Sequence, residues 1–120
     1  MKILIAEDDV MMLKTMEFKL KKEGFTVIAC ANGEEAITKI KTENPDVIIT
    51  DIMMPLINGL EMVRKVKAEL KLNIPIIVLS GVGLEKTVLE AFELGADDFI
   101  TKPFSPNELI VRIRRLMLKV

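Results

Sequence analysis

The chain alternates between short, unbroken apolar runs and segments with helical periodicity. The apolar runs lie within residues 2–6, 25–30, 47–50 and 75–80, and DFIT at 98–101 leads into a short fifth strand. Strands that alternate with helices predict βαβ units, in which helices cover both faces of a parallel sheet. The runs lack polar alternation, which is typical of strands buried on both faces. We therefore predict a single α/β domain over residues 1–120, doubly wound from five βα units into a three-layer sandwich.

Capping residues mark the ends of the helical segments. Helices are expected over residues 10–23, between Asn32 and Asn44, over 59–70, over 84–94, and from Ser105 to the C-terminus. Glu35 follows Asn32 by three residues, which is the spacing of a capping box. Pro106 and Glu108 after Ser105 are equally typical of a helix start. Each helix is thus expected directly after a strand.

Composition excludes several classes of function. The chain has no histidine, which removes His-based acid–base catalysis and most zinc sites. The single cysteine, Cys30, rules out an internal disulfide and favours a reducing compartment. The balance of 17 basic and 18 acidic residues, without Trp or Tyr, argues against direct nucleic-acid binding. There is no signal peptide and no apolar stretch of about 18 residues, so we expect a cytoplasmic protein without membrane contact.

Polar residues gather where the predicted strands end. Acids follow the first and third strands, and a hydroxyl and a lysine follow the fourth and fifth: Glu7, Asp8, Asp9, Asp51, Ser80 and Lys102. The carboxyl ends of parallel strands meet at one edge of a sheet, so we expect one site. Clustered carboxylates repel each other unless a cation lies among them, and hard oxygen ligands suit Mg²⁺. Mg²⁺ and Lys102 beside a nucleophilic Asp51 are the parts needed for phosphoryl transfer, with Ser80 bonded to a phosphoryl oxygen.

Four blocks, ILIAEDD, DIMMP, LSG and TKPFS, occur in this order along the chain. Together they resemble the receiver domains of two-component response regulators, and the resemblance covers the whole chain. It implies a flavodoxin-like fold with strand order 2-1-3-4-5. It also implies that Asp51 accepts a phosphoryl group from a phosphohistidine on a cognate histidine kinase or phosphotransfer protein.

The resemblance further implies a set of Mg²⁺ ligands, with Mn²⁺ as an acceptable substitute. Asp9 is expected to bind the ion directly and Asp8 mainly through water. The backbone carbonyl of Met53 is the third protein ligand in the family, beside Asp51 itself. Glu7 is interpreted as a local charge and not as a ligand. At the other side of the site, the Lys102–Pro103 peptide bond is expected to be cis, with Lys102 pairing with the acceptor.

Two residues match the switch of the family. Ser80 corresponds to the hydroxyl that is drawn to the phosphoryl group, and Phe99 to the aromatic side chain that then moves inward. An ordinary core phenylalanine would give the same sequence, so both interpretations of Phe99 stay open. Met53 and Val82 flank the site without a polar group to position water, which predicts slow self-dephosphorylation.

Residues near the C-terminus most resemble receivers of the winged-helix transcription-factor subfamily. Those receivers pair through the fourth helix, fifth strand and fifth helix. The matching pairs between subunits would be Asp98 with Arg112 and Glu93 with Arg114. Val88 stands where a basic partner for Glu108 would be expected, and a solvated helix face remains the alternative. The chain is either a stand-alone receiver or part of a longer regulator, and it carries no DNA-reading element.

Three other classes fit the sequence less well. A phosphatase of the haloacid dehalogenase type needs a second acid two residues after the nucleophile, where this chain has Met53. A nucleotide- or flavin-binding module needs a glycine-rich loop after the first strand, where this chain has three acids. A degenerate receiver would lack part of the site. We therefore expect no enzyme beyond self-phosphorylation and slow self-hydrolysis.

Overall fold

The structure is a computed structural model that describes residues 1–118. Its elements are β1 (Lys2–Ala6), α1 (Val10–Lys22), β2 (Thr26–Cys30), α2 (Gly33–Glu43), β3 (Val47–Asp51), α3 (Gly59–Arg64) with a π-helical turn η1 (Lys65–Glu69), β4 (Ile76–Ser80), α4 (Glu85–Leu94), β5 (Asp98–Thr101) and α5 (Pro106–Leu118). The prediction that the last helix reaches the C-terminus lies, for residues 119–120, outside the described residues. None of the helices described over residues 1–118 combines the length and the hydrophobicity that a membrane span requires.

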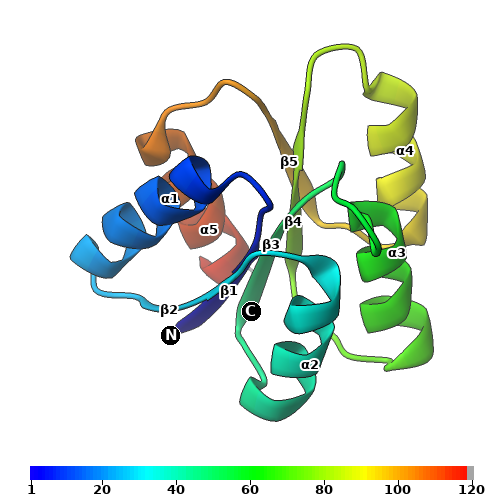
Figure 1. Cartoon of the computed structure of the whole chain (residues 1–120), viewed down its shortest axis with the longest axis horizontal. Helices are drawn as coiled ribbons and strands as arrows, with labels where there is room; N and C mark the ends of the chain where they lie inside the picture. The colour runs from blue at the N-terminus through cyan, green and yellow to red at the C-terminus, as the bar shows by residue number, and fades with distance from the viewer. Residues whose placement is uncertain (119–120) are drawn as a thin grey trace.

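The five strands form one parallel sheet in the order β2-β1-β3-β4-β5, so the predicted fold and strand order are confirmed. Helices α1 and α5 cover one face, and α2, α3 and α4 cover the other (Figure 1). Successive strand residues point to opposite faces. In β1, Leu4 therefore packs under α2 and α3, whereas Ile3 and Ile5 pack under α1 and α5. All three are fully buried, which explains why the strands carry no polar alternation.

The predicted helix boundaries hold with one difference. Asn32 accepts a hydrogen bond from the backbone N–H of Glu35 at 2.8 Å, and Ser105 accepts one from that of Glu108 at 3.2 Å. The segment expected to be α-helical over residues 59–70 instead widens into η1. There the N–H of Leu70 donates to the carbonyl of Lys65, five residues earlier, at 2.8 Å. The helical period alone did not predict this turn.

Two backbone hydrogen bonds and one close packing contact hold the segment between Asp51 and the start of α3. The N–H of Ile52 donates to the carbonyl of Leu79 at 3.0 Å, and the N–H of Gly59 donates to the carbonyl of Ile52 at 2.8 Å. The packing contact is at the start of α2. A Cβ atom on Gly33 would overlap the carbonyl oxygen of Ile57, so only glycine permits this approach. Helix α2 thereby supports the segment that borders Asp51.

We expect Gly33→Ala to destabilise the protein by about 1–3 kcal/mol, the usual cost of forcing extra atoms into a packed contact. The added Cβ would displace the Ile57 carbonyl, although alanine is otherwise the better helix former. Urea unfolding measures the change. Gly81→Ala is the control, because a Cβ there meets only a Leu84 side-chain atom at 3.8 Å. An unchanged or increased stability of Gly33→Ala would contradict the contact.

Candidate functional site

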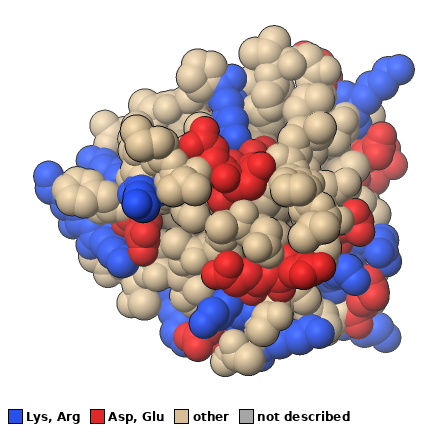
Figure 2. All heavy atoms as spheres, viewed as in Figure 1, with Lys and Arg blue, Asp and Glu red and all other residues tan. Residues whose placement is uncertain are grey.

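Four neighbouring strands deliver the polar residues to one edge of the sheet. Asp51 is the last residue of β3, and Ser80 is the last residue of β4. Glu7 follows β1 directly, and Lys102 follows β5. Because these strands are adjacent and parallel, their carboxyl ends lie together. Figure 2 shows acidic side chains gathered near the middle of one face, with basic atoms directly above them and uncharged atoms beside them.

Lys102 is bonded to two carboxylates at once. Its Nζ lies 2.7 Å from Oδ2 of Asp51 and 2.9 Å from Oε1 of Glu7. Burial disfavours the charged ammonium, but the hydrogen bonds to Asp51 and Glu7 outweigh it and raise the pKa of Lys102. The lysine therefore stays charged at neutral pH and holds Asp51 from one side. The Lys102–Pro103 peptide is cis, as the resemblance implies.

Glu7 is fully buried, which the sequence did not reveal. Burial raises its pKa to about 7, against the opposing effects of the Lys102 hydrogen bond and of the backbone N–H of Asp9. The neighbouring carboxylate of Asp51 raises it further. Glu7 can therefore gain or lose a proton near neutral pH.

Carboxylate oxygens of Glu7, Asp8 and Asp51 lie within 4.8 Å of one another. Glu7 and Asp51 are buried, whereas Asp8 is exposed. Three hard oxygen donors at this spacing, open to water on the Asp8 side, fit a small divalent cation such as Mg²⁺. One lysine neutralises only part of this negative charge, and a cation would neutralise the rest.

The acidic group differs from the one predicted from the sequence. Asp9, expected as a direct ligand, is exposed and caps α1 by accepting a hydrogen bond from the N–H of Met12 at 3.2 Å. Glu7, which was expected to be only a local charge, is instead the third member of the acidic group, together with Asp8 and Asp51. The reason is local: β1 ends at Ala6 and α1 begins at Val10, so Asp9 falls at the N-cap. A polar residue directly before a helical segment is the signal that could have shown this.

The chain turns back beside Asp51 at Met53. The N–H of Met53 donates to Oδ1 of Asp51 at 3.3 Å, so the peptide of Met53 lies next to the acceptor carboxylate. The side chain of Met53 is 64% exposed, and that of Val82, across the site, is 83% exposed. Neither offers a polar group. Metal ligation by the Met53 carbonyl stays a prediction.

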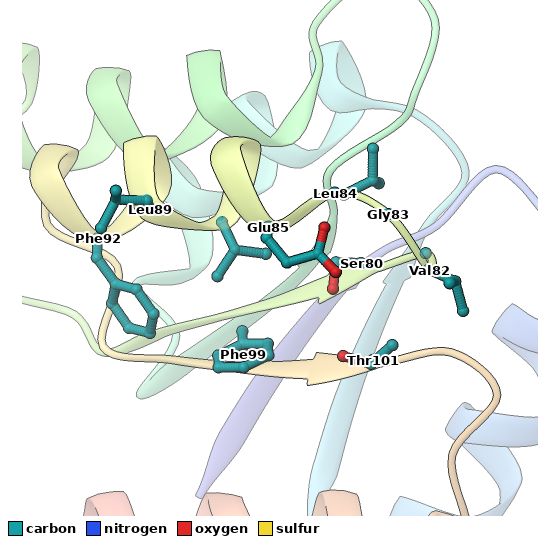
Figure 3. A pocket seen from close by; sticks show the side chains of 11 residues that line it. Ser80, Val82, Gly83, Leu84, Glu85, Leu89, Phe92, Phe99 and Thr101 are labelled. Atoms are coloured by element: carbon teal, nitrogen blue, oxygen red, sulfur yellow. The ribbon is translucent and has the colours of Figure 1, made fainter.

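Ser80 and Phe99 line the same cavity between α4 and β5 (Figure 3). Ser80 is 1% exposed. Phe99 is half-buried and meets Phe92 of α4 edge to face, with ring centroids 5.8 Å apart at 86°. A ring beside a cavity has room to move, which a fully packed core residue lacks. The geometry favours the switch interpretation of Phe99, whose movement stays a prediction.

Two charged residues of the predicted dimer face, Asp98 and Arg112, are bonded to each other within the chain. Asp98 is buried and accepts hydrogen bonds from Arg112 at 2.9 Å and from Arg115 at 3.0 Å. Although burial opposes ionisation, the N–H of Phe99 and the two arginines lower the pKa of Asp98. The pairing of Asp98 with Arg112 expected between subunits is thus found inside one subunit.

Arg114 is also bonded within the chain. Its guanidinium lies 5.6 Å from the ring centroid of Phe25 and 3.5 Å from a carboxylate oxygen of Glu23, on the α1 side of α5. Its predicted partner, Glu93, is on α4 and belongs to the other layer of helices (Figure 1). The structure therefore does not place Arg114 with Asp98 and Arg112.

A family model described as the response regulator receiver domain matches residues 3–114. The alkaline phosphatase synthesis transcriptional regulatory protein PhoP of Bacillus subtilis (strain 168) is 37% identical over 116 residues, which are 97% of this chain and 48% of PhoP. The probable transcriptional regulator ycf27 of Cyanophora paradoxa is 39% identical over the same shares of the two chains. The chain therefore spans about half the length of both relatives.

Solved structures agree with this match. The receiver domain of the Francisella response regulator 1452 has a TM-score of 0.90 at 34% identity and covers 98% of this chain and 97% of that chain. A response regulator receiver domain protein from Clostridium thermocellum has a TM-score of 0.92 at 26% identity, covering 98% and 94%.

Proposed function

The chain belongs to the response regulator receiver domain family, and from this premise we propose that it takes a phosphoryl group onto Asp51 from the phosphohistidine of a histidine kinase or phosphotransfer protein. The observation that carries the proposal is the bridge from Lys102 to Asp51 and Glu7, with Asp8 completing the acidic group. The Asp51 carboxylate thus lies between the Lys102 ammonium and the position that a metal cation bound by the acidic group would occupy.

Each side chain of the site would have its own role in the transfer of the phosphoryl group. An oxygen of Asp51 attacks phosphorus in line as the P–N bond of the donor breaks. The imidazole leaves with that electron pair and is protonated by solvent. Lys102 is already within hydrogen-bond distance of Asp51 and would stabilise the phosphoryl oxygens. Mg²⁺, or Mn²⁺ in its place, held by the carboxylates would neutralise the remaining phosphoryl charge. Ser80, at the end of the next strand, would bind a phosphoryl oxygen.

We propose that this is the extent of the catalysis, so that the protein is a signalling acceptor and not an enzyme with turnover. Self-dephosphorylation needs a water molecule aligned against phosphorus. Met53 and Val82, the exposed apolar residues beside the site, provide no hydrogen bond to align it. Slow self-dephosphorylation is the expected consequence.

The acceptor is tested by the intact mass of the protein after incubation with a small-molecule phosphodonor. We expect a gain of one phosphoryl group that requires Mg²⁺, is absent in EDTA, and is lost in Asp51→Asn because the amide is not a nucleophile. Asp46→Asn is the matched control, since Asp46 precedes the opposite end of β3 and bonds to the N–H of Lys2. A gain that persists in Asp51→Asn would show that another residue is the acceptor.

The output of the receiver is a separate proposal. Both relatives are named as transcriptional regulators and are about twice as long as this chain. We propose that phosphorylation changes the face formed by α4, β5 and α5, and that this cytoplasmic receiver thereby controls a transcriptional partner or its own dimerisation. The face would not itself contact nucleic acid.

Size-exclusion chromatography tests the dimer. Arg112 is bonded to Asp98 of its own chain, so a pair between subunits requires that Arg112 exchange partners. We expect the phosphorylated protein to elute as a dimer, and phosphorylated Arg112→Ala to remain a monomer. The control is Arg64→Ala, an exposed arginine of α3 paired with Glu69. A phosphorylated protein that stays monomeric would rule out dimerisation through this face.

A further inference from the structure

An apolar cavity lies between α4 and β5, beside the residues of the predicted switch. The cavity measures about 310 Å³. Its walls are apolar: Val88, Leu89 and Phe92 come from α4, and Phe99 comes from β5 (Figure 3). An apolar cavity of about 150 Å³ accommodates benzene. This one therefore has room for an aromatic molecule of two fused rings.

The cavity has one polar end. The hydroxyl-bearing residues Ser80 and Thr101 and the carboxylate-bearing Glu85 border it there (Figure 3). Ser80 is 1% exposed, and its hydroxyl makes no hydrogen bond to any residue among 1–118. Glu85 forms no ion pair within that same range. The Ser80 hydroxyl and the exposed Glu85 carboxylate, which both border the cavity, are acceptors for a cationic donor.

We propose that this cavity is a binding site for a small aromatic amine, with the rings between α4 and β5 and the ammonium at Glu85 and Ser80. Each part of the ligand has a counterpart. The rings would meet Phe92 and Phe99, which already present an edge-to-face pair. The ammonium would donate to the Ser80 hydroxyl and pair with Glu85. An aromatic acid would be repelled at the same end by the charge of Glu85.

A ligand here would oppose phosphorylation, and this consequence rests on the function proposed above. The Ser80 hydroxyl cannot bond to the ammonium and to a phosphoryl group at once. Rings that fill the cavity would also block inward movement of Phe99. Because coupling between two sites is reciprocal, phosphorylation of Asp51 should weaken amine binding by the factor with which the amine weakens phosphorylation at equilibrium.

Tryptamine is a direct probe, because the chain contains no Trp or Tyr and the fluorescence of the probe is observed without protein background. We expect saturable binding to the unphosphorylated protein in EDTA. Glu85→Gln should weaken it about fivefold, the effect of removing one exposed ion pair. Indole-3-propionate, which carries the opposite charge on the same rings, should bind more weakly than tryptamine. The absence of saturable tryptamine binding would overturn the proposal.

Filling the cavity distinguishes this site from the rest of the surface. Val88→Phe should abolish saturable binding, and Leu89→Phe, which changes a more exposed wall residue, covers the case in which Val88→Phe does not fold. Phe18→Ala is the control, because Phe18 is a 71% exposed apolar residue on α1. Binding that survives both cavity-filling changes, or that is lost in Phe18→Ala, would place the probe elsewhere and overturn the site.

The coupling is measured last, by titrating tryptamine into protein whose phosphorylation has been verified by mass. Weaker binding than to Asp51→Asn under the same conditions supports the coupling, and equal binding overturns it. Failure of the proposed function would instead appear as a missing mass gain. In that case the titrations in EDTA would still report on the cavity.

Discussion

Lys102→Met is expected to slow phosphorylation of Asp51 by about 100-fold, the usual loss when one positioned donor is removed from a site of developing charge. The methionine keeps most of the volume of the side chain but removes the ammonium that lies 2.7 Å from Asp51 and 2.9 Å from Glu7. The two buried carboxylates would then repel each other without a fixed cation between them. Attack on an anionic phosphoryl group would become correspondingly harder.

The rate of mass gain with a small-molecule phosphodonor at saturating Mg²⁺ measures this effect. Lys67→Met is the matched control. Lys67 is also a partly buried lysine in an ion pair, with Asp97 at 3.3 Å, but it lies on η1 away from the acidic group. We expect that variant to be phosphorylated at the normal rate. If Lys102→Met were phosphorylated equally fast, Lys102 would be a structural partner of Asp51 and no part of the transfer.

The second large effect concerns the pH dependence of stability, through Glu7. Burial raises its pKa from 4.5 to about 7, so between these values the folded protein holds a proton that the unfolded chain releases. The stabilisation is fully present below pH 4.5 and is lost as the pH rises through 7. A shift of this size corresponds to on the order of 3 kcal/mol. Glu7→Gln does not titrate, so its stability relative to the wild type should rise across this window by about that amount.

Urea unfolding of both proteins between pH 4.5 and 8, in EDTA so that no cation competes with the proton, tests the prediction. Asp98→Asn is a control whose stability relative to the wild type should stay constant over this range, which lies above the ordinary Asp pKa of 3.8. The pKa of Asp98 is lowered, so its stabilisation is present above the ordinary pKa and is lost as the pH falls. Parallel pH profiles for the wild type and Glu7→Gln would show that Glu7 stays ionised in the folded protein.

The assignment of Glu7 and Asp9 shows where reasoning from the sequence stopped. Three consecutive acids after a strand predict an acidic site, but not which of them faces it. The predicted bounds, a strand over 2–6 and a helix from residue 10, already placed Asp9 at the N-cap, but the resemblance nevertheless assigned it as a ligand. With α1 starting at Val10, Asp9 became the cap and Glu7 entered the site.

The arginines of α5 show what sequence spacing does and does not give. Asp98 and Arg112 carry charges expected for contacts between subunits, yet they pair with each other within one chain, where Arg115 also binds Asp98. Arg114 lies two residues after Arg112, which on a helix turns it toward a different side, here to Phe25 and Glu23. Sequence spacing gives the direction of a side chain on its helix, but not which neighbour will meet it.

The sequence by itself determined the architecture, because periodicity and capping are local and because strands buried on both faces must be apolar throughout. It also determined that Asp51, Ser80 and Lys102 would meet, since parallel strands end at one edge. Only the tertiary structure decided the burial of Glu7 and its bond to Lys102, 95 residues away. Only the tertiary structure revealed the cavity beside Phe99. A pKa or a cavity is set by which atoms exclude water around a group, and that depends on residues distant in the chain.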